Sequence, residues 1–323
     1  MISSYDITEI HNTDTDRHFT ISWKMTDWCN MHCPYCIMGK TGSPWIPENL
    51  ILQRAAQVNK IINLVPLDKM IRLHFIGGEV TYYNLIKVLN QIDLTRVDAF
   101  NLITNFSQTL DYFHTLITYL RSHEIYFTLV VSYHEEFGSK KDFLDKIAKI
   151  KAFAPETNLL ASVVIDATPD LDFIRSLREL DCVLNLTVLR DPKNNQNITI
   201  PDSVGQILNQ FDRHNTTITN YIYTQNRRYA FGTSAAANDQ IIEGGLVANN
   251  YWCTAGSTTV RILPNGMIVG AGCHYCQQHT IIGNIDQGDV CILNSPILCR
   301  LPVERRCSFC YKVNITKERT GHV

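Results

Sequence analysis

Short apolar runs alternate with segments of helical spacing through the first 190 residues of the chain. The runs predict strands at Phe19–Lys24, Ile71–Ile76, Ala99–Asn105, Tyr126–Ser132, Leu159–Asp166 and Cys182–Arg190. Most are followed by apolar residues that recur every three or four positions, as between Leu50 and Val65 and between Phe143 and Phe153. Strand–helix repetition of this kind is typical of a parallel sheet. An open partial barrel and a flat doubly wound sheet both satisfy the pattern.

The pattern changes after about residue 192. Asn194–Asn197 and Pro201 make a linker-like stretch, and a helix is expected at Ser203–Phe211. Residues 215–250 are polar and rich in Asn and Thr. We therefore predict an N-terminal segment at residues 1–18, a first domain at 19–200 and a smaller second domain at 215–323.

A β-hairpin is predicted within the second domain. Two strand-like runs, Thr258–Leu263 and Met267–Ala271, flank the turn residues Pro264, Asn265 and Gly266. Asn-Gly between two apolar runs is the strongest short-range signal for a hairpin. Because the chain is rich in Cys and Gly from here onward, the hairpin lies among candidate metal ligands.

Composition excludes several classes of protein. Of the 323 residues, 45% are hydrophobic and 19% are charged, which is ordinary for a globular chain and unlike a disordered one. The net charge of −2 leaves no broad basic field for nucleic acid. No run of about 18 apolar residues predicts a membrane span. The segment Met1–Asp16 is polar, unlike a secretory signal, so we expect a cytoplasmic protein.

Eleven cysteines are unusual for such a chain, and they cluster. Cys29, Cys33 and Cys36 follow the first predicted strand with the spacing C-x-x-x-C-x-x-C, whereas Cys182 reads as a plain core residue. Three thiolates on one short loop can hold three corners of a cubane iron–sulfur cluster and leave the fourth iron open to another ligand. Structural zinc is the alternative, with His32 as a fourth ligand.

The second predicted strand runs directly into Gly77, Gly78 and Glu79. Two glycines at a strand end let another group approach the backbone closely, because no side chain stands in the way. A simple strand-to-helix turn is the alternative reading.

Together, Cys29, Cys33, Cys36 and Gly77–Glu79 resemble the radical S-adenosylmethionine (radical SAM) superfamily. The resemblance implies a partial (β/α)6 TIM-type barrel over about residues 18–190. It also implies a 4Fe-4S cluster whose open iron is chelated by the amino and carboxylate groups of SAM. The region of Gly78 and Glu79 would bind the SAM amino group.

The resemblance implies further contacts to SAM. Tyr35, which precedes the last cysteine of the triplet, would lie beside the adenine. Thr104, Asn105 and Ser132 end the third and fourth predicted strands, where the family places polar groups near the ribose and carboxylate. Ordinary helix caps or loop residues are the alternative for these three. Val80 stands where the family motif usually has proline.

A second set of cysteines lies in the C-terminal region. Cys253 and Cys273 flank the predicted hairpin, and Cys307 and Cys310 form a C-x-x-C pair. A structural zinc ribbon would use such a set. The order also resembles the twitch or SPASM extensions of radical SAM enzymes, which implies a second, auxiliary 4Fe-4S cluster.

Three further cysteines in this region complicate the ligand count. Cys276, Cys291 or Cys299 could replace any of the four expected ligands. Cys276 could instead be a free thiol that donates a hydrogen atom to a substrate radical.

Charged residues also follow the predicted strands. His134, Glu135 and Glu136 follow the fourth strand, and Arg190 and Asp191 follow the sixth. Ligands bind at the carboxyl ends of parallel strands, so these side chains could meet a polar substrate; solvated loop charges are the equal alternative.

The resemblance leads to a radical SAM oxidoreductase or epimerase as the expected enzyme. Its expected substrate is a ribosomally made peptide that undergoes cross-linking, oxidation or epimerisation. A dehydrogenase or epimerase of an aminosugar or other small natural product is the first alternative. A non-catalytic iron–sulfur or zinc protein is the alternative from another class. An electron donor such as flavodoxin or ferredoxin is the expected protein partner, with no nucleic acid or membrane involved.

Overall fold

The computed structural model describes residues 2–3, 6–36, 44–166, 168–189, 220–224, 227–231, 242–243, 250–271, 274–300 and 314–317. The chain forms two compact units, each assembled from separate stretches of sequence. Unit 1 combines Met1–Trp23, Gln53–Arg72 and His214–Val323, and unit 2 combines Lys24–Leu52 and Leu73–Arg213. The domain boundaries at residues 18, 200 and 215 stay a prediction. The expected linker and the expected helix at Ser203–Phe211 lie outside the described residues.

Unit 2 contains the repeating β/α part of the chain. Its strands are neighbours in the order β4 (Met70–Ile76, from Leu73 onward in this unit), β5 (Val97–Thr104), β6 (Tyr126–Tyr133), β7 (Asn158–Ile165) and β8 (Val183–Val188). The strands β5 to β8 pair in parallel. The helices between them are α3 (Leu85–Leu89), α4 (Leu110–Ser122), α5 (Lys140–Phe153) and α6 (Leu171–Glu179), with short 3-10 turns η2 (Val80–Tyr82) and η3 (Glu135–Phe137). This succession of β/α units confirms the predicted α/β class and is consistent with a partial TIM-type barrel.

Local sequence explains where these helices begin. The side chains of Thr109, Ser139 and Asp170 each cap the helix that follows by accepting hydrogen bonds from backbone N–H groups of its first turn. Such caps satisfy donors that the helix itself leaves unpaired. Each helix therefore starts a few residues after the preceding strand ends, which keeps the connections short.

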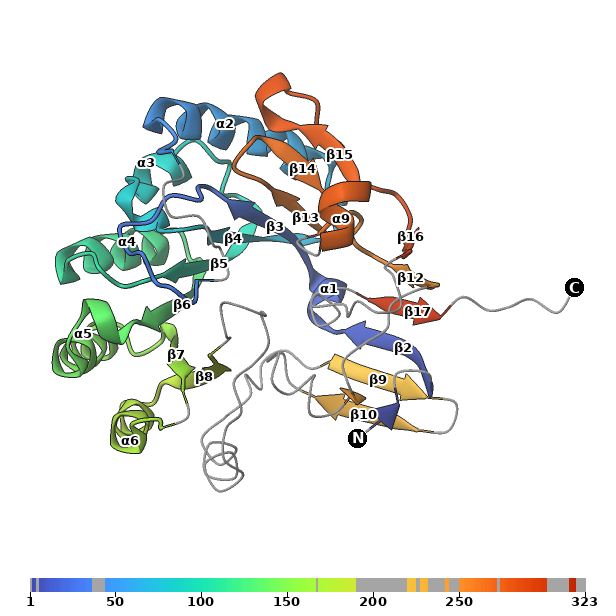
Figure 1. Cartoon of the computed structure of the whole chain (residues 1–323). Helices are drawn as coiled ribbons and strands as arrows, with labels where there is room; N and C mark the ends of the chain where they lie inside the picture. Colours follow the sequence, from blue (N-terminus) through green and yellow to red (C-terminus); the bar gives the residue numbers. More distant parts are fainter. Residues whose placement is uncertain are drawn as a thin grey trace, which may run out of the picture. The chain divides into compact units, whose positions relative to one another are not determined.

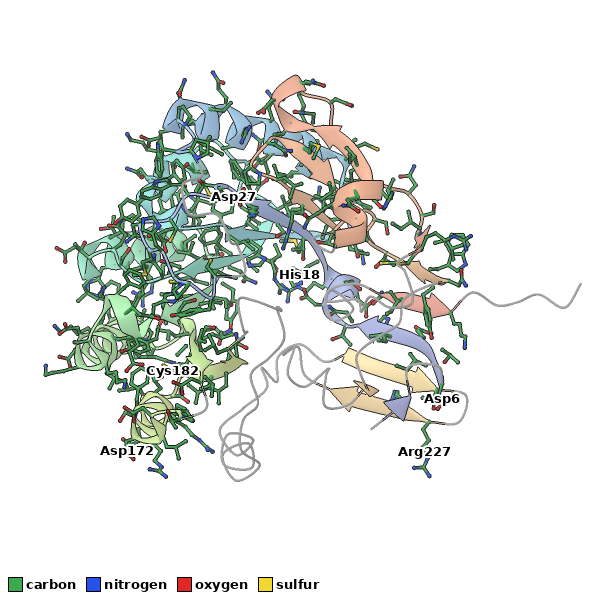
Figure 2. The ribbon with its side chains drawn as sticks, in the orientation of Figure 1. Asp6, His18, Asp27, Asp172, Cys182 and Arg227 are labelled. Carbon is green, nitrogen blue, oxygen red and sulfur yellow. The ribbon has the colours of Figure 1, made fainter. Side chains whose placement is uncertain are left out.

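One face of the sheet in unit 2 is covered by these helices. Helices α4, α5 and α6 lie on the same side of strands β5 to β8 (Figure 1). Their aromatic residues Phe113, Phe143 and Phe173 are buried, and Tyr133 of β6 packs against two of them, with ring centroids 5.1 Å from Phe143 and 4.6 Å from Phe173. Cys182, labelled in Figure 2, is buried next to β8 and confirms its prediction as a core residue.

Unit 1 contains two larger groups of strands and one short pair. An antiparallel sheet has the order β10 (Arg228–Phe231), β9 (Asn220–Thr224), β2 (Ile7–Asn12), β17 (Ile315–Lys317), β12 (Tyr251–Cys253) and β16 (Ile297–Leu298). The second group has β15 (Ile281–Asn284), β14 (Met267–Val269), β13 (Thr259–Ile262) and β3 (His18–Lys24, in this unit to Trp23). The short strands β1 (Ile2–Ser3) and β11 (Ile242–Glu243) pair in parallel. Helices α1 (Asp14–Arg17) and α9 (His274–His279), the 3-10 turn η4 (Ile285–Gln287) and most of α2 (Glu48–Leu64) complete the unit.

The predicted hairpin is confirmed as β13 and β14. Arg261 lies opposite Val269 in an antiparallel pair, and Gly266 in the turn has a φ of 82°. A left-handed backbone conformation of this kind favours glycine. The hairpin also pairs in parallel with β3, where Val260 lies opposite Ile21. Among the described residues, no helix is long and apolar enough to span a membrane.

Candidate functional site

Two loops at the carboxyl ends of strands run side by side in unit 2. The first follows β3 and carries the cysteine triplet; the second follows β4 and carries Gly77, Gly78 and Glu79. The backbone N–H of Gly78 donates to the carbonyl of Thr26 at 2.9 Å, and that of Glu79 donates to the carbonyl of Trp28 at 2.8 Å. The two motifs that the sequence singled out are therefore joined by backbone hydrogen bonds.

The glycine pair permits this close approach. A Cβ atom on Gly77 would lie 2.5 Å from the carbonyl oxygen of Thr26, and one on Gly78 would lie 2.0 Å from that of Trp28. Both distances are far inside van der Waals contact, and backbone atoms cannot rotate away as a side chain can. The close neighbour of these glycines is the backbone of the cysteine loop, so any side chain here would displace that loop.

Glu79 is a fully buried acid that accepts four hydrogen bonds. Its Oε1 accepts from the Thr81 amide at 3.0 Å, the Thr81 hydroxyl at 2.6 Å and the Thr104 hydroxyl at 2.9 Å. Its Oε2 accepts from the Asn105 amide at 2.5 Å. Burial raises the pKa of the Glu79 carboxyl, and the hydrogen bonds from Thr81, Asn105 and Thr104 oppose that shift.

Asn105 connects this acid to the cysteine loop. Its backbone N–H is held by Glu79, while its Nδ2 donates to Asn30 Oδ1 at 2.8 Å and to Cys29 Sγ at 3.6 Å. Thr104 and Asn105, expected near SAM, thus lie at the predicted site, and their contacts are with Glu79 and the cysteine loop. These contacts link the ends of β4 and β5 to Cys29.

A strained turn directly after Asn105 helps to hold it. Phe106 has a φ of 62°, which is rare for a bulky side chain. Its carbonyl and that of Gln108 both accept from Lys146 Nζ, each at 2.8 Å. The ammonium group also lies 4.7 Å from the centre of the Phe106 ring. Lys146, on α5, thereby secures the backbone that positions Asn105.

The three thiols of the triplet differ in exposure. Cys33 is buried, Cys29 is half-buried and Cys36 is exposed, and the Cys36 amide donates to the Cys33 carbonyl at 3.1 Å. Burial raises the pKa of the Cys33 thiol to about 11, and charge on Cys36 and Cys29 adds to the shift. Burial also raises the pKa of Cys29. Mutual repulsion among three thiolates is relieved when they bind a positively charged metal centre.

The donor set fits an iron–sulfur cluster by its chemistry. Three thiolates without a carboxylate among them are soft ligands that suit iron–sulfur clusters and zinc. Within the described ranges, however, no three side chains of His, Cys, Asp or Glu already gather in a metal-binding arrangement. Binding at Cys29, Cys33 and Cys36 therefore requires their side chains to converge. His32, the fourth ligand of the zinc alternative, is exposed.

Tyr35 contacts the end of β6. Its hydroxyl donates to Glu136 Oε2 at 2.8 Å and lies 3.3 Å from His134 Nδ1, and its ring stacks on that of His134 with centroids 6.1 Å apart. His134 Nδ1 also lies 3.4 Å from Cys33 Sγ. Burial raises the pKa of Tyr35 and lowers that of His134. His134 and Glu136, which the sequence marked only as strand-end residues, thus meet the cysteine loop.

Aromatic residues that the sequence analysis did not single out flank the triplet. The Trp28 ring contacts those of Trp45 and Tyr82, with centroids 5.0 Å and 5.1 Å away. The sequence feature that could have indicated this aromatic cluster was the position of Trp28, immediately before Cys29. Ser132, the remaining residue expected near SAM, lies on β6 opposite Ser162 of β7.

The described residues include only part of the second cysteine set. Cys253 is buried on β12, and its sulfur accepts from the Ala255 amide at 3.4 Å. Cys276 is buried on α9, Cys299 is buried and Cys291 is exposed. Cys273, Cys307 and Cys310 lie outside the described residues. The auxiliary cluster and the hydrogen-donor role of Cys276 therefore stay predictions.

Comparisons with known proteins do not identify a family. No family model matches the chain, and no curated protein matches it. Among solved structures, a 3-dehydroquinate dehydratase from Enterococcus faecalis matches with 10% identity over 66% of this chain and 98% of the other, at a TM-score of 0.25. A likeness at that score supports no conclusion about this protein.

Proposed function

We propose that the protein is a radical SAM enzyme whose reactive centre is built on the loop of Cys29, Cys33 and Cys36. The observation that carries the proposal is the link from Glu79 through Asn105 to Cys29. A simple strand-to-helix turn would not need Glu79 to be fully buried, or to be connected through Asn105 to a cysteine loop that follows another strand. A non-catalytic zinc or iron–sulfur protein accounts for the thiols alone.

A 4Fe-4S cluster held there would supply the electron for reductive cleavage of SAM to methionine and a 5′-deoxyadenosyl radical, and that radical would abstract hydrogen from an unactivated C–H bond. The three thiolates hold the cluster, and Asn105 orients Cys29 by its Nδ2 hydrogen bond. The Glu79 carboxylate is already shared among Thr81, Thr104 and Asn105. We therefore assign recognition of the SAM amino group to the backbone carbonyls of Gly77–Glu79, since the N–H groups of Gly78 and Glu79 already donate to Thr26 and Trp28.

Other residues of the site would position SAM and exclude water. Tyr35, held by Glu136, offers a ring face for the adenine, and Ser132 offers a hydroxyl at the carboxyl end of β6. Correct placement of the reacting groups is the protein's main contribution in cofactor chemistry of this type. A flavodoxin- or ferredoxin-type protein would reduce the cluster. The proposal also includes an auxiliary 4Fe-4S cluster on the C-terminal cysteines.

The test uses the full chain, reconstituted without oxygen and supplied with SAM and dithionite. We expect about eight irons per chain and 5′-deoxyadenosine as a product. Replacing Cys29, Cys33 and Cys36 together by Ala should abolish 5′-deoxyadenosine and leave about four irons, held by the later cysteines. Cys182→Ala is the matched control, since this buried thiol lies outside the site, and it should retain both properties.

Two results would contradict parts of this proposal. If 5′-deoxyadenosine still forms in the triple variant, the cysteine loop is not the reactive centre. One zinc and about four irons in the intact protein would remove the auxiliary cluster and leave the reaction at the first centre in place.

A further inference from the structure

The face of the sheet opposite helices α4, α5 and α6 has an unusual composition. Strand alternation places residues two apart on the same face, so the buried residues of β7 and its part-exposed residues point in opposite directions. The buried set is Leu159, Ala161, Val163 and Ile165; the part-exposed set is Asn158, Leu160, Ser162 and Val164. We call the part-exposed side of β5 to β8 the open face.

Strand register groups the open face into rows. Ser132 of β6 lies opposite Ser162 of β7, which lies opposite Asn185 of β8, and we call these three residues the neutral row. A second polar row, nearer the strand starts, joins the part-exposed Asn101 and Asn158 through the buried Thr128. Between the two rows lies an apolar row of Ile103, Val130, Leu160 and Val183.

Neither polar row contains a charged residue. Among the described residues, the charged side chains nearest to the carboxyl end of the open face are Glu135, Glu136 and Asp166, which follow their strands, while Asp98 of β5 lies on the opposite face by strand alternation. Arg190 and Asp191, expected after the last strand, lie outside the described residues. Glu135 is itself paired with Lys140 at 3.0 Å. Among the residues that the structure describes, a ligand on the open face would therefore meet hydroxyl and amide groups before it met a charge.

The neutral row retains capacity for hydrogen bonds. Asn185 Nδ2 donates to Ser162 Oγ at 3.2 Å, which leaves the Asn185 carbonyl oxygen and the Ser162 hydroxyl proton for other partners. Ser132 makes no side-chain hydrogen bond within the part of the chain that the structure describes. The row can thus both donate to and accept from a bound molecule.

The position of the neutral row connects it to the proposed centre. Ser132 lies one residue beyond Val131, the register partner of Thr104, so the row begins beside Asn105 at the carboxyl ends of the strands. From Ser132 the row continues through Ser162 to Asn185, away from the residues that Glu79 holds. A molecule next to SAM at the ends of β4 to β6 would extend over β7 and β8.

We propose that Ser162 and Asn185 of the neutral row bind the reacting part of the substrate, beside the SAM that Ser132 contacts, and that this part is uncharged and rich in amide or hydroxyl groups. This inference rests on the proposed function and narrows its substrate class. Moving a phosphate, carboxylate or ammonium group from water onto a half-buried face without a counter-charge is unfavourable. Neutral amides and hydroxyls keep their hydrogen bonds there. An internal peptide segment and an N-acylated sugar share this chemistry; an aminosugar with a free ammonium group does not.

The experiment measures, by equilibrium dialysis, how tightly labelled probes bind to the cluster-loaded protein in the presence of SAM. One probe pair is acetyl-Ser-Asn-Gly-amide and acetyl-Ser-Asp-Gly-amide; the other is N-acetylglucosamine and glucosamine. The neutral member of the bound pair should bind at least about tenfold more tightly than its charged analogue. The pair that binds distinguishes a peptide from a sugar.

Asn185→Asp introduces a carboxylate with almost no change of shape. It should weaken binding of the neutral probe about tenfold and favour glucosamine relative to N-acetylglucosamine. Asn63→Asp is the matched control, because Asn63 is exposed on α2 in unit 1, and it should leave binding unchanged.

The proposal is overturned if a charged probe binds as tightly as its neutral analogue, if no neutral probe binds, or if Asn185→Asp behaves like Asn63→Asp. Formation of 5′-deoxyadenosine by the same protein without any probe is measured in parallel. Its absence would refute the proposed radical chemistry whatever the dialysis shows, so the two failures are distinguishable.

Discussion

Along β7, neighbouring residues belong to two different environments. Ala161 is fully buried on the side that faces the helices, while Ser162, the next residue, is part-exposed on the open face and receives a hydrogen bond from Asn185. The side of β5 to β8 that faces the helices, which we call the covered face, is largely apolar and packed with aromatic rings. The open face instead alternates polar and apolar rows. The difference indicates that one side of the sheet provides stability and the other side provides groups for a ligand. The carboxyl ends of the strands contact the cysteine loop.

The largest effect on stability is expected from the covered face. Phe143→Ala removes a buried ring that contacts Phe106, Tyr133 and Phe173, and should lower the free energy of unfolding by about 3–5 kcal/mol. Urea denaturation of the reconstituted protein measures this. Phe137→Ala is the control, because that ring is 43% exposed, and its cost should stay below about 1 kcal/mol. Equal losses in both variants would contradict the assignment of the covered face as the core.

A smaller effect is expected at the carboxyl ends. Glu79→Gln replaces an acceptor oxygen by an amide donor, so one of the donors from Thr81, Thr104 or Asn105 loses its partner. The free energy of unfolding should fall by about 1–3 kcal/mol. The cluster spectrum should also change, because Asn105 positions Cys29. An unchanged cluster spectrum in the folded variant would show that Glu79 does not influence the position of the cysteine loop.

The pH dependence of stability provides a second measurement on Glu79. Its pKa is raised above the ordinary 4.5 by burial, so the folded state binds this proton more tightly than the unfolded state does. The resulting stabilisation is fully present below pH 4.5 and is lost as the pH rises through the folded pKa. Glu79→Gln has no such proton and should lose this part of the pH profile. Identical profiles for both proteins would show that Glu79 is not the group responsible.

Lys146→Met should have a more local effect. It removes the hydrogen bonds to the carbonyls of Phe106 and Gln108 but keeps a long apolar side chain, at a cost of about 1–2 kcal/mol. Hydrogen exchange should accelerate at residues 105–108 more than in α5 itself. Lys141→Met is the control, since Lys141 is exposed and pairs with Asp145 on its own helix, so its loss should leave exchange at residues 105–108 unchanged. If exchange at 105–108 stays slow, the strained turn does not depend on Lys146.

The smallest change in the free energy of unfolding is expected from a substitution on the open face, and a substitution on the covered face provides the comparison. Ser162→Ala should change the free energy of unfolding by less than about 0.5 kcal/mol, because water can replace the hydroxyl beside Asn185 on the open face. Ala161→Ser places a hydroxyl on the covered face, one residue away, and should cost about 1–3 kcal/mol. A reversed order of these two costs would mean that the open face is covered in the folded protein.

Several features of the site were accessible from sequence because they are local. Cys29, Cys33 and Cys36 are close in the chain, Gly77–Glu79 follows a recognisable apolar strand, and Asn265-Gly266 is a turn signal in itself. The contacts of these motifs were not accessible. The need for glycine at position 78 arises from the carbonyl of Trp28, fifty residues away, and Lys146 reaches Phe106 only after α5 packs on the sheet.

By itself, the sequence determined the alternation of strands and helices in this protein, since apolar periodicity depends only on which residues are neighbours along the chain. It also determined which cysteines share a loop. Tertiary structure alone decided that residues 1–23 and 53–72 join the C-terminal region in one compact unit. It likewise decided that Glu79 is buried and accepts hydrogen bonds from Thr104 and Asn105. Only the strand register placed Ser132, Ser162 and Asn185 in one row. Strand register and burial depend on contacts between distant segments, and hydrophobic periodicity contains no information about which distant residues will meet.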